Sequence, residues 1–211
     1  MATHEGPTDR GNGRPPRQLI LAAALALVLG SAAVYVIGGR SDNGAGSASP
    51  KAIGARLNTG QMAAFVYKDK GEPIAPEFRF VDGTGKERSM KDWAGRVVLL
   101  NLWATWCAPC RKEMPDLDKL QAELGSKDFE VVAVSVDRAG LEASRKFLAS
   151  IDTKKLALFA DPTARFATEL KAIGLPATIL IGRDGREIGR LLGPAEWASQ
   201  DAKRLVGNAL K

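Results

Sequence analysis

Apolar and amphipathic stretches alternate along the chain from about residue 78 to its end. Two nearly continuous apolar runs, residues 96–103 (RVVLLNLW) and 129–136 (FEVVAVSV), predict central strands that are buried on both faces. Between them, residues 108–124 carry apolar positions along one side and charged positions elsewhere, which predicts an amphipathic helix. Strands that alternate with helices predict a three-layer α/β domain around one central sheet.

Shorter patterns predict the elements around these three. A Gly or Asp-Gly turn between two short runs indicates a hairpin, and a Pro is common in the first turn of a helix. The further predicted elements are a hairpin of residues 78–82 and 86–89, helices at 141–149 and 164–171, a strand at 156–159, a closing hairpin of 177–181 and 186–192, and a terminal helix at 194–210. Because helices connect the central strands, we expect these strands to be largely parallel.

The first 50 residues predict a membrane attachment. Residues 19–37 are uncharged and apolar, and at about 1.5 Å per residue they match the roughly 30 Å hydrocarbon core of a bilayer. We expect an uncleaved anchor rather than a signal peptide, because the run continues past the small residues 31–33 that could mark a cleavage site. Residues 38–50 (GGRSDNGAGSASP) predict a flexible linker.

Arginines precede the apolar run, which favours a cytoplasmic tail at residues 1–18. The expected protein is therefore a single-pass protein of the inner membrane, with its C-terminal domain in the periplasm.

Composition and charge limit the possible partners. With 45% hydrophobic and 26% charged residues, the chain is globular rather than disordered. Residues 51–211 hold +5 of the formal net charge of +6, and their charges of both signs are interspersed along the sequence. This pattern indicates a solvated surface, and we expect no nucleic-acid partner.

The candidate chemistry rests on two cysteines, Cys107 and Cys110, because the single histidine, His4, lies in the polar N-terminal tail. A structural zinc site needs four ligands and a disulfide-rich scaffold needs several bridges, so the residue counts exclude both. We expect neither a bound metal nor a cofactor.

The two cysteines lie three residues apart, where a predicted buried strand meets a predicted helix. At the helix N-terminus, the pKa of Cys107 should be lowered, which makes its thiolate the nucleophile. Cys110, one turn further in, is placed to resolve a mixed disulfide at Cys107. Alternatives are a structural disulfide, which would close a very short loop, a copper(I) chaperone that binds the metal through both thiolates, and a thiol peroxidase.

The segment LNLWATWCAPCRKEMP resembles the active site of the thioredoxin superfamily, and residues 60–211 as a whole resemble its TlpA/ResA-like family of membrane-anchored periplasmic thiol:disulfide interchange proteins. The resemblance implies a thioredoxin-like fold, a central mixed sheet with helices on both faces, preceded by one transmembrane helix. It also implies that Cys107 and Cys110 form a catalytic redox disulfide.

The resemblance assigns three further residues to the binding of substrate proteins. Trp106 matches the aromatic residue beside the substrate groove. Pro176, in GLPATIL, matches a cis-proline that faces the cysteines, and Leu175 before it supplies backbone for strand-like pairing with the substrate.

Two positions depart from the relatives. Where thioredoxins have a buried carboxylate six residues before the first cysteine, this chain has Asn101, so the proton of Cys110 must go to water or to another acid, for which Glu113 is the candidate. Relatives devoted to cytochrome c maturation typically have Glu after the cis-proline, whereas Ala177 stands here.

The Ala-Pro dipeptide between the cysteines supplies no charge to stabilise a thiolate, which predicts a reductant rather than a strong oxidant. In an oxidising periplasm a reductant needs resupply, so the resemblance implies a membrane electron donor. It also implies protein disulfide clients, among them copper-centre assembly factors and the oxidase subunit with the binuclear copper site, and a role in cytochrome oxidase or cytochrome c assembly.

Overall fold

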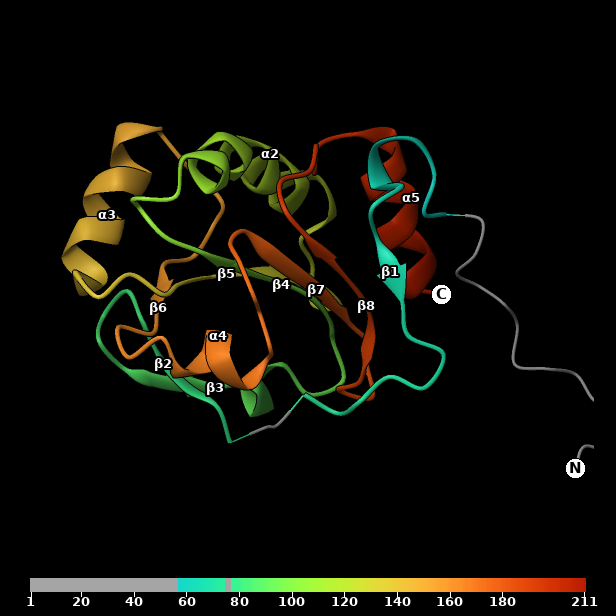
Figure 1. Ribbon diagram of the computed structural model, residues 1–211, viewed down its shortest axis with the longest axis horizontal. Helices are drawn as coiled ribbons and strands as arrows, with labels where there is room; N and C mark the ends of the chain where they lie inside the picture. Colours follow the sequence, from blue (N-terminus) through green and yellow to red (C-terminus); the bar gives the residue numbers. More distant parts are fainter. Residues whose placement is uncertain (1–56, 75–76) are drawn as a thin grey trace, which may run out of the picture. The chain divides into compact units, whose positions relative to one another are not determined.

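A mixed sheet organises the part of the chain that the structure, a computed structural model, describes, which is residues 57–74 and 77–211 (Figure 1). Its strand order is β1-β8-β7-β4-β5-β6-β2-β3. The strands are β1 (Val66–Tyr67), β2 (Arg79–Asp82), β3 (Glu87–Ser89), β4 (Val97–Trp103), β5 (Phe129–Ser135), β6 (Phe159–Ala160), β7 (Ala177–Ile181) and β8 (Glu187–Leu192). The helices are η1 (Gly60–Met62), η2 (Met90–Trp93), α2 (Ala108–Leu124), α3 (Gly140–Ser150), α4 (Arg165–Glu169) and α5 (Gln200–Ala209).

Strands β4 and β5 lie at the centre of the sheet, and every residue of β4 is buried, as its continuous apolar sequence predicts. The expectation that the central strands are largely parallel is confirmed for β4, β5 and β6 and is wrong for β7. Within the described sheet only β4–β5 and β5–β6 pair in parallel, while β7 runs antiparallel to β4. The hairpins β2–β3 and β7–β8 are antiparallel because a tight turn can join strands in no other way.

Alternate residues of β4 point into two separate hydrophobic clusters, one on each face of the sheet. Leu99 and Trp103 face the cluster formed with α2, α3 and α5, whereas Leu100 and Leu102 face the cluster formed with η2 and α4. Helices thus cover both faces, as expected from the sequence (Figure 1).

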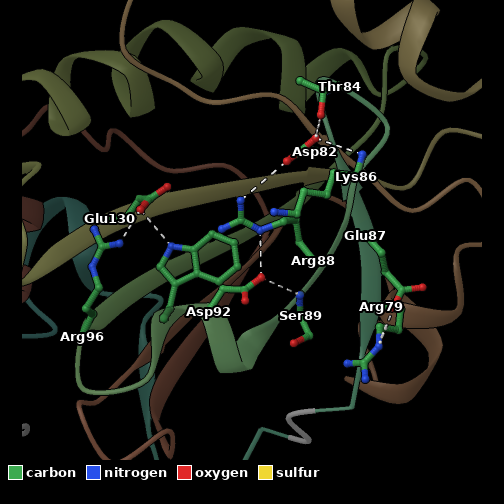
Figure 2. Close-up of polar contacts among 11 residues, drawn as sticks. Arg79, Asp82, Thr84, Lys86, Glu87, Arg88, Ser89, Asp92, Arg96 and Glu130 are labelled. Atoms are coloured by element: carbon green, nitrogen blue, oxygen red, sulfur yellow. Dashed lines mark hydrogen bonds and ion pairs between the residues drawn. The ribbon is translucent and has the colours of Figure 1, made fainter.

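Polar side chains beside the β2–β3 hairpin contact Trp93, which belongs to the hydrophobic cluster formed with η2 and α4 (Figure 2). The guanidinium of Arg88 lies 5.3 Å from the centre of the Trp93 ring and pairs with Asp92 at 2.8 Å. The indole N–H of Trp93 donates to Glu130 at 2.9 Å, and Glu130 also pairs with Arg96 at 2.8 Å. The buried Trp93 therefore has an acceptor for its indole N–H and a cation over its ring, and it links Arg88 of the hairpin to Glu130 of β5.

The last helix begins later than the sequence predicts. Helix α5 begins at Gln200 rather than at residue 194, because the side chain of Ser199 caps it by accepting from the backbone N–H of Ala202 at 3.2 Å. The segment from Pro194 to Trp197 is not helical, and two of its N–H groups bind a side chain of α2.

Two shorter elements also differ from their predicted bounds. Strand β6 begins at Phe159, because the backbone N–H groups of Lys155 and Leu156 are taken by the carboxylate of Asp118. Helix α4 is bounded by Ala164 and Lys171, both with a positive φ of 54° that ends regular helical geometry.

The predicted tail, anchor and linker, residues 1–18, 19–37 and 38–50, lie outside the described residues. In the part that is described, no helix combines the length and apolarity that crossing a membrane requires. Three short elements were not predicted: η1, η2 and the edge strand β1, which pairs antiparallel with β8.

Candidate active site

The two cysteines lie where β4 leads into α2, and they form a disulfide with Cα atoms 5.3 Å apart. Cys107 is the N-cap residue of α2, and its Sγ accepts from the backbone N–H of Cys110 at 3.3 Å. A sulfur in this position receives the positive end of the helix dipole, which favours the thiolate when the disulfide is reduced.

The two sulfurs differ in access, as the sequence predicts. Cys110 is fully buried, whereas Cys107 keeps 5% of its surface exposed. Both cysteines are thus buried, and Cys107 is the more accessible of the two.

The loop before the cysteines is fixed by Asp137, which sequence analysis did not find. Its carboxylate accepts from the backbone N–H of Thr105 at 3.2 Å and from the hydroxyl of the same residue. Burial disfavours the charged form of Asp137, but the hydrogen bonds from Thr105 and Ala139 outweigh it, and the pKa of this carboxyl is lowered. An ionised Asp137 thus holds the loop that carries Trp106 and Cys107.

The Leu175–Pro176 peptide bond is cis, as the resemblance implies. Ala177 pairs with Leu102, so Pro176 lies at the end of the sheet where β4 leads to the cysteines. The carbonyl of Pro176 accepts from the N–H of Gly193 at 2.9 Å, and Leu175 packs against the cluster that contains Cys107.

Trp106 is 70% exposed, directly beside a buried cysteine. Exposure of so large an apolar side chain is consistent with the substrate-groove position that the resemblance gives it. Trp103, on β4, is fully buried and belongs to the core.

Glu113, three residues after Cys110 on the same helix, is a buried carboxylate with polar partners on both oxygens. Oε1 accepts from Nδ2 of Asn101 at 2.8 Å, and Oε2 accepts from the N–H of Ala195 at 3.2 Å and from Nε1 of Trp197 at 3.3 Å. Burial raises the pKa of Glu113 to about 7, against the opposing effect of these three donors.

Asn101 and Glu113 are thus in direct contact, which the sequence did not predict. Asn101 occupies the position at which thioredoxins have a buried carboxylate. In this protein the carboxylate of Glu113, from α2, lies against Asn101. Asn101, on β4, points to the face of the sheet that α2 covers, and Glu113 points from α2 to the same place.

Trp197 was missed as a site residue because residues 194–210 were interpreted as one helix. The sequence does contain a signal for the later start of the helix. Ser199 followed by Gln200 and Asp201 is typical of a helix N-terminus. With the helix started there, Trp197 falls in the preceding loop.

A disulfide at a helix N-terminus, a cis-proline at the same end of the sheet and a central mixed sheet define a thiol:disulfide oxidoreductase of thioredoxin-like fold. The chain belongs to the redoxin family, whose model matches residues 69–206.

Curated relatives and solved structures agree with this assignment. Thiol-disulfide oxidoreductase ResA of Bacillus cereus is 32% identical over 142 residues, which cover 67% of this chain and 80% of the relative. ResA of Bacillus thuringiensis subsp. konkukian is 34% identical over 142 residues, which again cover 67% of this chain and 80% of the relative. A crystal structure described as thiol:disulfide interchange protein DsbE from Chlorobium tepidum is 31% identical with a TM-score of 0.60, and the match covers 67% of this chain and 98% of that chain.

Proposed function

We propose that this protein reduces disulfide bonds in other proteins, with Cys107 as the nucleophile and Cys110 as the resolving thiol. The observation that carries the proposal is the asymmetry of the pair: Cys107 caps α2 and keeps 5% of its surface exposed, while Cys110, inside the helix, is fully buried. A mixed disulfide at Cys107 lies next to the buried Cys110, and attack by Cys110 on it releases the reduced client.

The reaction has two exchange steps. The Cys107 thiolate attacks a client disulfide, a Cys107–client disulfide forms, and one client sulfur leaves as a thiolate. The Cys110 thiol then loses its proton, its thiolate attacks Sγ of Cys107, and the second client sulfur leaves. Two electrons pass to the client, and the Cys107–Cys110 disulfide seen in the structure is the oxidised product.

Glu113 is the proton acceptor for Cys110 in this proposal. Both residues lie on the buried side of α2, one turn apart. With a pKa raised to about 7 by burial, Glu113 is partly ionised at neutral pH and can both take the proton and return it. It replaces the carboxylate that Asn101 lacks.

The client is held beside Trp106, Leu175 and Pro176. Leu175 precedes β7 at the end of the sheet where β4 leads to the cysteines, and an extended client segment would pair with its backbone there. Trp106, next to Cys107 in the sequence, offers an exposed apolar surface.

We further propose that residues 19–37 anchor the protein in the inner membrane, with residues 1–18 in the cytoplasm, 38–50 as the linker and 60–211 as a periplasmic domain. The uncharged apolar sequence of residues 19–37 supports this arrangement. A membrane electron donor would restore the dithiol, and the clients would belong to copper-centre or cytochrome c assembly.

Two experiments test the function. Equilibration with glutathione or dithiothreitol should give the low potential of a reductant, and a potential near that of strong oxidants would overturn the reductase proposal. A Cys110→Ser variant in native membranes should accumulate mixed disulfides at Cys107, which mass spectrometry identifies. Tight stoichiometric copper(I) binding with negligible reductase activity would instead assign the copper chaperone.

A further inference from the structure

Trp197 uses its only polar atom on the carboxylate of Glu113. The side chain is fully buried, and Nε1 donates to Oε2 of Glu113 at 3.3 Å, beside the N–H of Ala195 at 3.2 Å. A second buried indole in the same hydrophobic cluster, that of Trp103, has no hydrogen-bond partner. Packing alone therefore does not require the contact that Trp197 makes.

The backbone on both sides of Trp197 is held in place. The N–H of Gly193 donates to the carbonyl of the cis-proline Pro176 at 2.9 Å, and Ser199 caps α5. The segment between these two attachments crosses over Glu113 and approaches it with two N–H groups. Its geometry fixes where the carboxylate oxygen lies.

A hollow of about 500 Å³ lies beside this contact, between α2 and residues 194–196, and Glu113 is among its lining residues. Its charged lining side chains besides Glu113 are Lys112 and Asp116 from α2 and Glu196 from the loop. From β4 and β7, only uncharged groups, Asn101 and Thr178, join the hydrogen-bond network of Glu113. The hollow gives the otherwise buried carboxyl a route to exchange its proton with water.

We propose that Trp197 is a positioning residue for thiol exchange, holding the Glu113 carboxylate where it can receive the proton of Cys110. The inference rests on the proposed role of Glu113. An N–H that donates to a carboxylate stabilises the ionised form and costs energy when the carboxylate is protonated. Trp197 therefore both orients the group and keeps it ready to accept a proton near neutral pH.

The test removes the indole N–H and leaves a smaller aromatic ring, in Trp197→Phe, with Trp103→Phe as the matched control for the lost volume. Both variants remove the same atoms from a fully buried tryptophan, but only the first removes a hydrogen bond. The first readout is the titration of the Glu113 carboxyl carbon, followed by NMR in the oxidised protein. We expect Trp197→Phe to move its midpoint upward by about 0.5 to 1 in pH, and Trp103→Phe to leave it in place.

The second readout is the rate at which Cys110 resolves a preformed mixed disulfide at Cys107. For Trp197→Phe we expect this rate to fall about 3- to 10-fold at pH 6 and to match the wild-type rate at pH 9, where Glu113 is ionised in both proteins. An unchanged titration midpoint in Trp197→Phe, or an equal movement in Trp103→Phe, would overturn the inference.

A separate variant distinguishes this failure from a failure of the proposed function. If Glu113→Gln resolves the mixed disulfide at the wild-type rate, Glu113 is not the proton acceptor, whatever the NMR titration shows. Should Trp197→Phe not fold, benzothienylalanine at position 197 keeps the two-ring shape without the N–H, and the same two outcomes apply.

Discussion

The side-chain amide of Asn101 donates to Oε1 of Glu113 at 2.8 Å, so that a residue unable to titrate directly contacts one that titrates near neutral pH. The same Nδ2 atom reaches the hydroxyl of Thr178 at 3.0 Å, while Oδ1 of Asn101 is buried without a partner. The amide is thus arranged as a donor, which suits the ionised form of Glu113.

Replacing Asn101 with Asp should place a second carboxylate against Glu113. Two carboxylates at hydrogen-bond distance share one proton, and the pKa for loss of that proton rises. We expect the pH dependence of mixed-disulfide resolution to move upward by roughly one pH unit or more, measured by stopped-flow fluorescence. The comparison variant Asn101→Leu, which removes the donor without adding charge, should move it less; equal movement in both would contradict the shared-proton explanation.

Glu113→Gln should change how stability depends on pH. Because the folded-state pKa of Glu113 is raised from 4.5 to about 7, the folded state binds more protons than the unfolded state between these values, and stability falls as pH rises through this window. Relative to the Gln variant, the wild type should lose about 3 kcal/mol of unfolding free energy between pH 4 and pH 8. Urea denaturation across this range measures the difference, and parallel curves for the two proteins would exclude a raised pKa.

Trp106→Ala should impair client binding without affecting the fold. The side chain is 70% exposed, so we expect a stability change within about 0.5 kcal/mol. KM for a protein disulfide should rise several-fold, while the equilibrium with glutathione stays unchanged, because Trp106 would contact the client and not the sulfurs. The matched control is Val66→Ala, an exposed apolar residue on the edge strand β1, which should leave KM unaltered.

Arg190→Met should destabilise the protein by leaving a buried charge without its partner. Arg190 binds both carboxylate oxygens of Glu187, which is 4% exposed, and also donates to the carbonyl of Leu170 at 2.8 Å. The expected loss of unfolding free energy is about 3 kcal/mol by urea denaturation. The double variant Arg190→Met with Glu187→Leu should recover most of that loss, and no recovery would mean that the bond to Leu170 carries the effect.

Secondary structure could be predicted from the sequence where the local pattern of apolar residues is compatible with one kind of element only. Continuous apolar runs identified β4 and β5, and the helix after Cys107 has its predicted bounds. The cis-proline was predicted by resemblance. The antiparallel direction of β7 could not be predicted from its sequence. The local pattern identifies a strand but does not say beside which strand, or in which direction, it pairs.

The role of Trp197 depended on tertiary structure. A Pro followed by helix-compatible residues predicts a helix from residue 194, but the backbone N–H of Ala195 instead donates to the carboxylate of Glu113, and the indole N–H of Trp197 donates to the same carboxylate. Likewise, the backbone that sequence analysis assigned to a strand near residue 156 is bound by Asp118 of α2. Long-range side-chain acceptors override local preference in both places.

The sheet also separates the two cysteines from one of the two hydrophobic clusters. Both cysteines belong to the hydrophobic cluster under α2 and α5, and neither belongs to the cluster between the sheet and α4. Volume-conserving changes around Phe80 and Phe166, on the second side, should therefore alter the melting temperature while the sulfur chemistry continues unaltered. The hydrophobic cluster without the cysteines can therefore be redesigned for thermal stability, while the cluster that contains them is left unchanged.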